Sequence, residues 1–279
     1  MYGYDRIRES IVAGSFYSAD PYVLKMQIED YLLNAEDFET KNIKALICPH
    51  AGYIYSGQVA GYSYKQVAKN SYDCVIVVSP SHAEYFDFIS IFNGDGYSTP
   101  LGNVMIDKER AELLKAASPE ILFSDKGHNE EHSIEVQLPF LQTIFNKNLK
   151  FIPIAIGVQS KKNINNLGKA MGETFKDHNV LIVASTDLSH YHTYSDALLL
   201  DREVIKYVQR YAIEKLEEEY LSEKIEMCGG GPVISTMIAA KEMGADSAYV
   251  LKYQNSGDIS GEKKAVVGYL SAAFFSKSK

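Results

Sequence analysis

Four short apolar runs, separated by segments with helical periodicity, set the pattern of this sequence. The runs are residues 44–48, 73–79, 150–157 and 179–184. Continuous runs rich in β-branched residues are typical of strands that are covered on both faces, as in parallel sheets. Their alternation with helices predicts a single α/β domain over residues 1–279, with a mostly parallel central sheet flanked by helices.

The same periodicity predicts the remaining elements. Apolar positions spaced by three and four residues predict helices over residues 21–33, 56–69, 107–117, 132–145, 162–176, 196–209 and 213–221, and from Pro232 to about Met243. The rest of the pattern predicts an extended lead-in over residues 10–18, short strands within 86–106, and closing strands over 247–255 and 264–275. The segment NSGDISGEKK between the two closing strands is rich in turn residues.

Composition and charge narrow the possible partners. The net charge is 28 − 36 = −8, and there is no long basic run, so we expect neither a nucleic-acid partner nor an anionic membrane surface. No apolar run approaches the roughly 18 residues of a membrane-spanning helix. The first ten residues lack the apolar core of a signal peptide. An odd count of three cysteines makes no disulfide framework, and these features together predict a cytoplasmic protein.

Three of the predicted strands end in polar loops that carry histidines. His50 follows the strand at 44–48, His82 follows the strand at 73–79, and Asp187 with His190 follows the strand at 179–184. The carboxyl ends of parallel strands lie on one edge of a sheet, where ligand sites form. Imidazole is the commonest metal ligand in proteins, so we expect His50 and His82 to share a metal site.

Cys228 is the strongest candidate for a third ligand. It precedes Gly229-Gly230-Gly231-Pro232, and Pro232 is expected to be the first helical residue. A helix N-terminus lowers the pKa of a thiol and favours the thiolate, which binds metals or attacks substrates. The glycines would allow a close approach of the backbone. Cys48 and Cys74 lie in or beside apolar strands and are expected to be core residues.

Other polar residues are candidates for roles around the metal. Asp187 could bind the ion, orient an imidazole or accept a proton, and His190 is a candidate general acid or base. His132 and Glu135 fall at i and i+3 on one face of a predicted helix, a spacing that resembles half of a carboxylate-histidine metal motif. An ordinary helix start rich in acidic residues has the same pattern. Tyr53 is a candidate pocket-lining residue.

At these residues the sequence resembles the Memo family, in its prokaryotic branch called AmmeMemoRadiSam system protein B. The segments that carry the resemblance appear in the expected order: RESIVAGSFYS, CPHAGYIYSG, SPSHAEY, YSTPLG, EEHSIEVQLPFL, STDLSHY and MCGGGP.

The resemblance implies a fold similar to the class III extradiol dioxygenases of the LigB type. Those enzymes hold non-haem iron with two histidines and a carboxylate, and the Memo pocket has two histidines and a cysteine, which match His50, His82 and Cys228. Asp187 and His190 match residues of the same pocket. Thiolate in place of carboxylate changes the charge and redox preference of the metal, so ring cleavage is not implied.

Three hypotheses of function follow. The first is a metal-dependent oxidoreductase, with iron expected ahead of copper, of unknown substrate. The second is a non-catalytic module that binds a small molecule or peptide and works with a radical-SAM protein and an AMMECR-type partner. The third is a zinc-dependent hydrolase with the same ligands.

Overall fold

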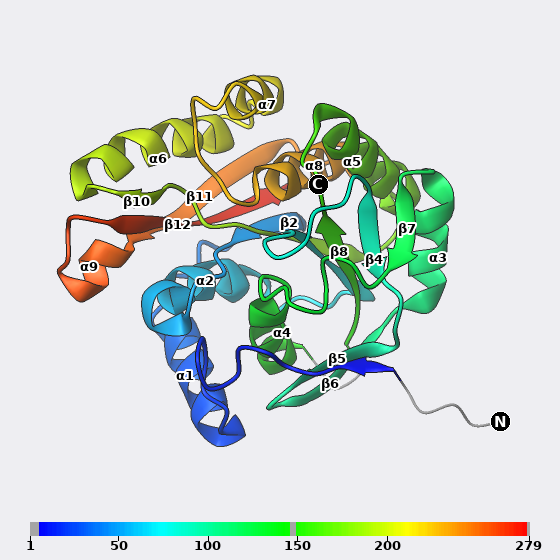
Figure 1. Ribbon diagram of the computed structural model, residues 1–279, viewed down its shortest axis with the longest axis horizontal. Coiled ribbons are helices and arrows are strands. Elements are labelled where there is room, and N and C mark those ends of the chain that lie inside the picture. Colours follow the sequence, from blue (N-terminus) through cyan, green and yellow to red (C-terminus); the bar gives the residue numbers. More distant parts are fainter. Residues whose placement is uncertain (1–5, 146–148, 278–279) are drawn as a thin grey trace.

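Strands and helices alternate along the chain, as the apolar pattern predicts (Figure 1). The computed structural model describes residues 6–145 and 149–277, so the ends of the predicted domain lie outside the described residues. The strands are β1 (Ile7–Arg8), β2 (Ile43–Cys48), β3 (Cys74–Pro80), β4 (Ile89–Phe92), β5 (Gly96–Thr99), β6 (Gly102–Ile106), β7 (Ile121–Ser124), β8 (Lys150–Ile156), β9 (Val180–Ser185), β10 (His190–His192), β11 (Ser247–Asn255) and β12 (Val266–Phe275). The helices are α1 (Pro21–Leu33), α2 (Tyr53–Val67), α3 (Lys108–Ala117), the 3₁₀ helix η1 (Glu135–Gln137), α4 (Leu138–Ile144), α5 (Lys161–Phe175), α6 (Tyr194–Gln209), α7 (Ile213–Leu221), α8 (Gly230–Glu242) and α9 (Ser256–Ser260).

The centre of the sheet is parallel. Strands β6, β8, β3, β9 and β2 lie side by side in this order, and all four pairings are parallel. Antiparallel strands follow outside them, with β5 beside β6 at one flank and β12 beside β2 at the other. Every residue of β3 is buried, which explains why its sequence is continuously apolar rather than alternating.

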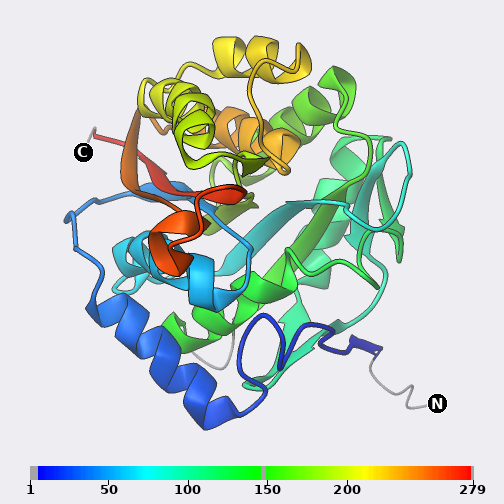
Figure 2. The same cartoon turned by 60° about the vertical axis from the view of Figure 1, so that its left-hand side comes forward.

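Helices cover both faces of the sheet. Helix α8 contacts β2, β3 and β9, and α5 and α7 pack on α8; on the other side α2 contacts β2 and β12, and α1 and α4 pack on α2. Figures 1 and 2 show these two groups on opposite sides of the strands. One continuous apolar core runs through the layers, as expected for a single α/β domain. No helix within the described ranges is long and apolar enough to cross a membrane.

The predicted helix at 132–145 is wrong in its first half. At its predicted start, the backbone N–H and the hydroxyl of Ser133 both donate to the Glu131 carboxylate. Regular α-helix begins only at Leu138, with Pro139 in its first turn, where proline is tolerated best. His132 therefore lies in a loop and not on a helix face with Glu135.

Smaller errors have similar local causes. Residues 10–18 form turns with one isolated bridge between Ala13 and Tyr17 instead of an extended segment. The segment predicted as turn after β11 contains the short helix α9, which is stabilised by a capping box between Asn255 and Asp258. The strand β7 has too short an apolar run to be detected from the sequence.

Candidate metal centre

Three neighbouring strands deliver the predicted site residues to one edge of the sheet. The parallel strands β3, β9 and β2 are adjacent, and their register pairs Cys48 with Ser185. Their last residues are Pro80, Ser185 and Cys48, so that His82, Asp187 and His50 each come two residues after a strand. The loops that the sequence singles out therefore converge in space.

Three imidazoles meet at this edge. The ring centroids of His50 and His82 are 5.2 Å apart, and His132 lies 5.5 Å from His50 and 5.2 Å from His82. One nitrogen of each ring lies within 4.8 Å of a nitrogen of the other two. These histidines could therefore hold a metal ion together, since neutral imidazole binds zinc, iron and copper.

His50 is the buried member of the group, at 2% exposure. Burial, and the neighbouring rings of His82 and His132, lower its pKa well below the usual value, so the ring is neutral. Its Nδ1 lies 2.9 Å from the hydroxyl of Ser185, and its backbone N–H donates to the Asp187 carboxylate at 2.9 Å. A neutral, fixed ring of this kind suits metal binding.

His82 is held by a carboxylate that the sequence analysis did not single out. Its backbone N–H donates to Glu131 Oε2 at 2.6 Å, and its Nδ1 lies 3.0 Å from Glu131 Oε1. Burial lowers the pKa of His82, but the bond to Glu131 outweighs this effect and the net shift is upward. Because a carboxylate only accepts hydrogen bonds, Nδ1 carries the hydrogen, and in the neutral ring Nε2 is available as a ligand.

Glu131 is itself buried, at 1% exposure. Burial raises the pKa of the Glu131 carboxyl, but the bonds from His82 and Ser133 outweigh burial and lower it overall. The acidic pair Glu130-Glu131 beside His132 was the available sequence signal. That signal does not show which of the two acids turns inward, nor that it bonds a histidine 49 residues away.

Cys228 contacts His50, but it does not belong to the group of three side chains that could hold a metal ion together. Its Sγ lies 3.2 Å from His50 Nε2 and accepts the backbone N–H of Asp187 at 3.2 Å. Burial and the nearby Asp187 charge raise the pKa of the Cys228 thiol. The expected lowering by a helix N-terminus is therefore wrong for the metal-free chain. Helix α8 also begins at Gly230, so Pro232 is not its first residue.

Glycine allows this part of the chain to approach the sheet. A Cβ atom at Gly229 would lie 2.3 Å from the backbone oxygen of Ser185, at the end of β9. The absence of a side chain at this position brings Cys228 against His50. The other two cysteines, Cys48 and Cys74, are fully buried in strands, and all three thiols are free.

Asp187 and His190 follow β9 at the same edge of the sheet. Burial raises the pKa of Asp187 to about 7, opposed by hydrogen bonds from the backbone of His50 and Ala51. His190 Nδ1 lies 2.8 Å from the backbone oxygen of Leu188, so Nδ1 donates and Nε2 is the free acceptor. Burial lowers the pKa of His190, which keeps this acceptor unprotonated at neutral pH.

Tyr53 and Glu135 point away from the imidazoles. The Tyr53 hydroxyl donates to the backbone oxygen of Val136 at 2.7 Å, and its ring packs on Tyr17 and Phe140. The Glu135 carboxylate has 0% exposure and accepts hydrogen bonds from Arg8, Tyr17 and the backbone of residues 11 and 12. Figure 2 shows the segment with Arg8, residues 11 and 12 and Tyr17, in dark blue, beside α4.

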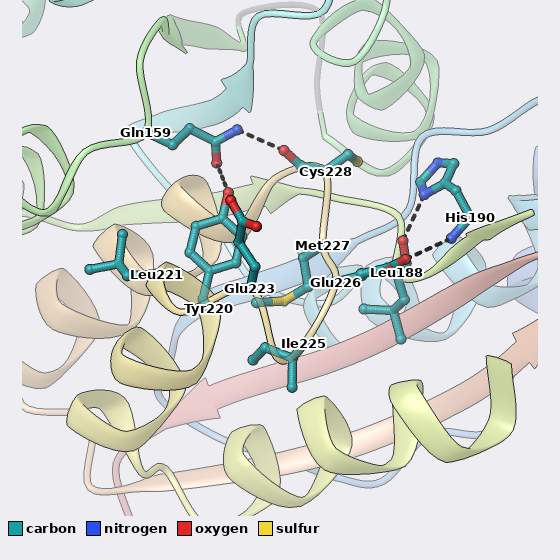
Figure 3. Close-up of a pocket in the computed structure, with 10 residues that line it drawn as sticks. All are labelled: Gln159, Leu188, His190, Tyr220, Leu221, Glu223, Ile225, Glu226, Met227 and Cys228. Atoms are coloured by element: carbon teal, nitrogen blue, oxygen red, sulfur yellow. Dashed lines mark hydrogen bonds between the residues drawn. The ribbon is translucent and has the colours of Figure 1, made fainter. Parts of the chain in front are cut away.

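A pocket of about 540 Å³ opens on the other side of Cys228 (Figure 3). Cys228 and His190 line it, and the three grouped imidazoles do not. Its remaining lining residues come from the end of α7 and the segment after it, together with Gln159 and Leu188: Tyr220, Leu221, Glu223, Ile225, Glu226 and Met227. Gln159 links Cys228 to the end of α7, because it donates to the Cys228 backbone oxygen at 2.8 Å and accepts from the Tyr220 hydroxyl at 3.0 Å.

Comparison with known proteins places this chain in a family. A family model described as Memo-like protein matches residues 8–273. The chain belongs to the Memo family. Among its Memo relatives, a MEMO1 family protein of Saccharolobus solfataricus is 39% identical and covers 94% of this chain and 97% of its own length. A MEMO1 family protein of Methanobrevibacter smithii is 38% identical, over 96% of this chain and 99% of its own length.

One solved structure supports the fold of this Memo protein. An uncharacterized protein of Escherichia coli K12 superimposes with a TM-score of 0.52 at 14% identity, and the match covers 83% of this chain and 99% of the other. At this identity the likeness concerns the fold alone.

Proposed function

We propose that this Memo protein is a metal-dependent oxidoreductase that holds a divalent ion, iron ahead of copper, at the carboxyl edge of its sheet. The observation that carries the proposal is the group formed by His50, His82 and His132, whose ligand nitrogens lie within 4.8 Å of one another. Cys228, the third ligand that the sequence predicts, is a further donor beside His50. Two ligands of one tetrahedral ion, at about 2.0 Å and 2.3 Å from it, lie roughly 3.5 Å apart. The separation of 3.2 Å between His50 Nε2 and Cys228 Sγ is close to this value.

The donor set suits a redox-active ion. Imidazole and thiolate together accept iron, copper and zinc, and bound iron would supply electron-transfer and oxygen chemistry. The protein residues hold and orient the ligands: Glu131 fixes the His82 ring, and Asp187 holds the backbone of His50 and Cys228. We assign the movement of protons between the pocket and the ion to His190 and Asp187, since His190 lines the pocket and its Nδ1 is already bonded to Leu188.

Metal analysis of protein purified without oxygen tests this proposal. We expect one equivalent of iron in the unchanged protein and none in the His50→Ala, His82→Ala double variant. His178→Ala is the matched control, because this histidine lies at the opposite, amino edge of the sheet beside β9. Stoichiometric metal in the double variant would refute the proposal.

Two single variants then identify the third ligand. We expect His132→Ala to lower the affinity for the ion more than Cys228→Ser does, because His132 belongs to the grouped imidazoles. The reverse result would give the third position to the thiolate. A stoichiometric zinc ion, with hydrolysis that is indifferent to oxygen, would favour the zinc hydrolase.

The pocket favours a second candidate function, ligand binding without catalysis. Its volume of about 540 Å³ falls within the usual range for small-molecule sites, and a peptide side chain would also fit. In this case the protein would act with the radical-SAM and AMMECR-type partners that the family resemblance implies. Co-purification of the tagged protein with these partners, together with the absence of bound metal, would support this function over the first.

A further inference from the structure

A chain of buried polar side chains ends on the inner nitrogen of His50. It starts at Tyr64 in α2, continues through Gln137 in η1 and reaches Ser185 at the end of β9. The exposed fractions of these three residues are 0%, 1% and 0%. Neither the metal proposal nor the family resemblance gives these residues a role.

The orientation of the Gln137 amide follows from its neighbours. Its terminal nitrogen lies 3.0 Å from the backbone oxygen of Pro49, which can only accept a hydrogen bond. Its oxygen accepts from the Tyr64 hydroxyl at 2.7 Å. The second hydrogen of the amide therefore points at the Ser185 hydroxyl, 2.7 Å away.

The single hydrogen of the Ser185 hydroxyl also has a fixed acceptor. The hydroxyl lies 2.7 Å from the backbone oxygen of Ser133, which again can only accept. Ser185 therefore donates to Ser133 and accepts from Gln137, and only a lone pair faces His50. The contact of 2.9 Å between Ser185 Oγ and His50 Nδ1 then requires the hydrogen to be on Nδ1, so Nε2 carries a lone pair towards Cys228.

We infer that Gln137 and Ser185 are positioning residues that lock His50 in the tautomer with the hydrogen on Nδ1. The lock uses only neutral groups, whereas His82 is fixed by the charge of Glu131. It exists without any bound ion. Only its consequence for ion binding rests on the proposed function, because a hydrogen on Nε2 would occupy the position that a metal needs.

Nitrogen NMR of the imidazole side chains in the metal-free, full-length protein tests the lock. With the His50 signals assigned by comparison with His50→Asn, we expect a protonated, pyrrole-type Nδ1 and an unprotonated, pyridine-type Nε2. A protonated Nε2 in the unchanged protein would overturn the inference. This measurement stays informative if the protein binds no iron, so the two proposals can fail separately.

Variants of Ser185 give a second readout. We expect Ser185→Ala to mix the two tautomers and to lower the affinity for added Fe(II) or Zn(II) by roughly ten- to a hundredfold, and Ser185→Thr to restore the single tautomer because it keeps the hydroxyl. Ser79→Ala is the matched control, since Ser79 is a fully buried serine near the end of β3 whose hydroxyl donates to the backbone oxygen of Ile154. The inference is wrong if Ser185→Ala keeps the tautomer of the unchanged protein. It is also wrong if Ser79→Ala changes that tautomer equally.

Discussion

The candidate metal centre lies between two segments, an inner and an outer wall, which differ in the burial and pairing of their charged side chains. The inner wall is formed by residues 128–137 together with Arg8, and two of its three carboxylates are buried, with Glu131 at 1% and Glu135 at 0% exposure. The outer wall is formed by residues 220–228 and faces the pocket. Its Glu226 side chain is 44% exposed and pairs with His192, and the Glu223 side chain has no hydrogen bond or ion pair with any described residue.

The difference in burial and pairing suggests that the two walls have different roles. Buried charges must be matched by donors, since an unpaired charge in the interior is costly, and a matched network keeps its geometry. The inner wall therefore supplies fixed ligands. The outer wall has exposed and partly unpaired groups, as is usual for binding surfaces of lower local stability.

Removal of Arg8 should have the largest effect on stability. Its guanidinium donates to Glu135 at 2.6 Å and to the backbone oxygens of His128 and Glu131 at 2.6 and 2.5 Å. Arg8→Met leaves the Glu135 carboxylate buried without its cation, which typically costs about 3–5 kcal/mol. Urea denaturation of both proteins measures this loss.

An exposed ion pair provides the control for Arg8. Lys25 lies 3.9 Å from Glu29 on the surface of α1, and Lys25→Met should change stability little, because exposed pairs contribute little. If Arg8→Met were as mild as Lys25→Met, the inner wall would not be a matched network.

Loss of the Glu131 charge should weaken the metal site more than the fold. Glu131→Gln keeps the size of the side chain, but it replaces one accepting oxygen by a donor that faces His82 or Ser133. Loss of such an orienting carboxylate typically lowers metal affinity ten- to a hundredfold, or about 1.4–2.7 kcal/mol. Competition with a chelator measures the affinity. Glu130→Gln is the control, because this neighbour is exposed, and an equal effect of both changes would contradict the role of Glu131.

The pH dependence of folding should report a buried histidine of the inner wall. Burial lowers the pKa of His128 to about 3 in the folded protein, against about 6.5 in the unfolded chain. Between these values the unfolded chain binds the additional proton, so the stability is fully present above about pH 6.5 and falls as the pH falls. A drop from pH 7 to 5 should cost about 2 kcal/mol from this group.

His128→Gln removes this titration. Denaturation curves at pH 7 and pH 5 give the loss of unfolding free energy between these pH values. This loss should be smaller in the variant than in the unchanged protein by about 2 kcal/mol. The same loss in both proteins would mean that His128 takes up a proton in the folded state.

These contrasts also explain how far the sequence alone could lead. The helices at Pro21–Leu33 and Ile213–Leu221 agree with the predicted bounds, because their apolar stripes and starts are local signals. The convergence of His50, His82 and Asp187 was predictable too, because parallel strands share an edge. Both successes depend only on local periodicity and on one rule of sheet topology.

The inner wall could not be predicted in the same way. Its geometry depends on a loop held by Arg8, which is more than 120 residues away from the Glu131 and Glu135 that it bonds, and no local pattern encodes such a contact. The helix was predicted to start at residue 132, whereas His132 lies in a loop, and its ring packs beside those of His50 and His82. The pKa of Cys228 is raised by burial and by the nearby Asp187, and both depend on the folded chain rather than on a local pattern.

Neutralising Glu223 should have the smallest effect of all. Glu223 is exposed, and with no partner to lose, Glu223→Gln should leave stability within about 0.5 kcal/mol of the unchanged protein. The comparison is strict because Glu131→Gln makes the same chemical change on the inner wall, where two backbone N–H groups and an imidazole point at the carboxylate. Parallel urea denaturation of the two variants gives the answer. If Glu223→Gln were as destabilising as Glu131→Gln, the outer wall would be as tightly bonded as the inner wall, and the contrast between the two walls would fail.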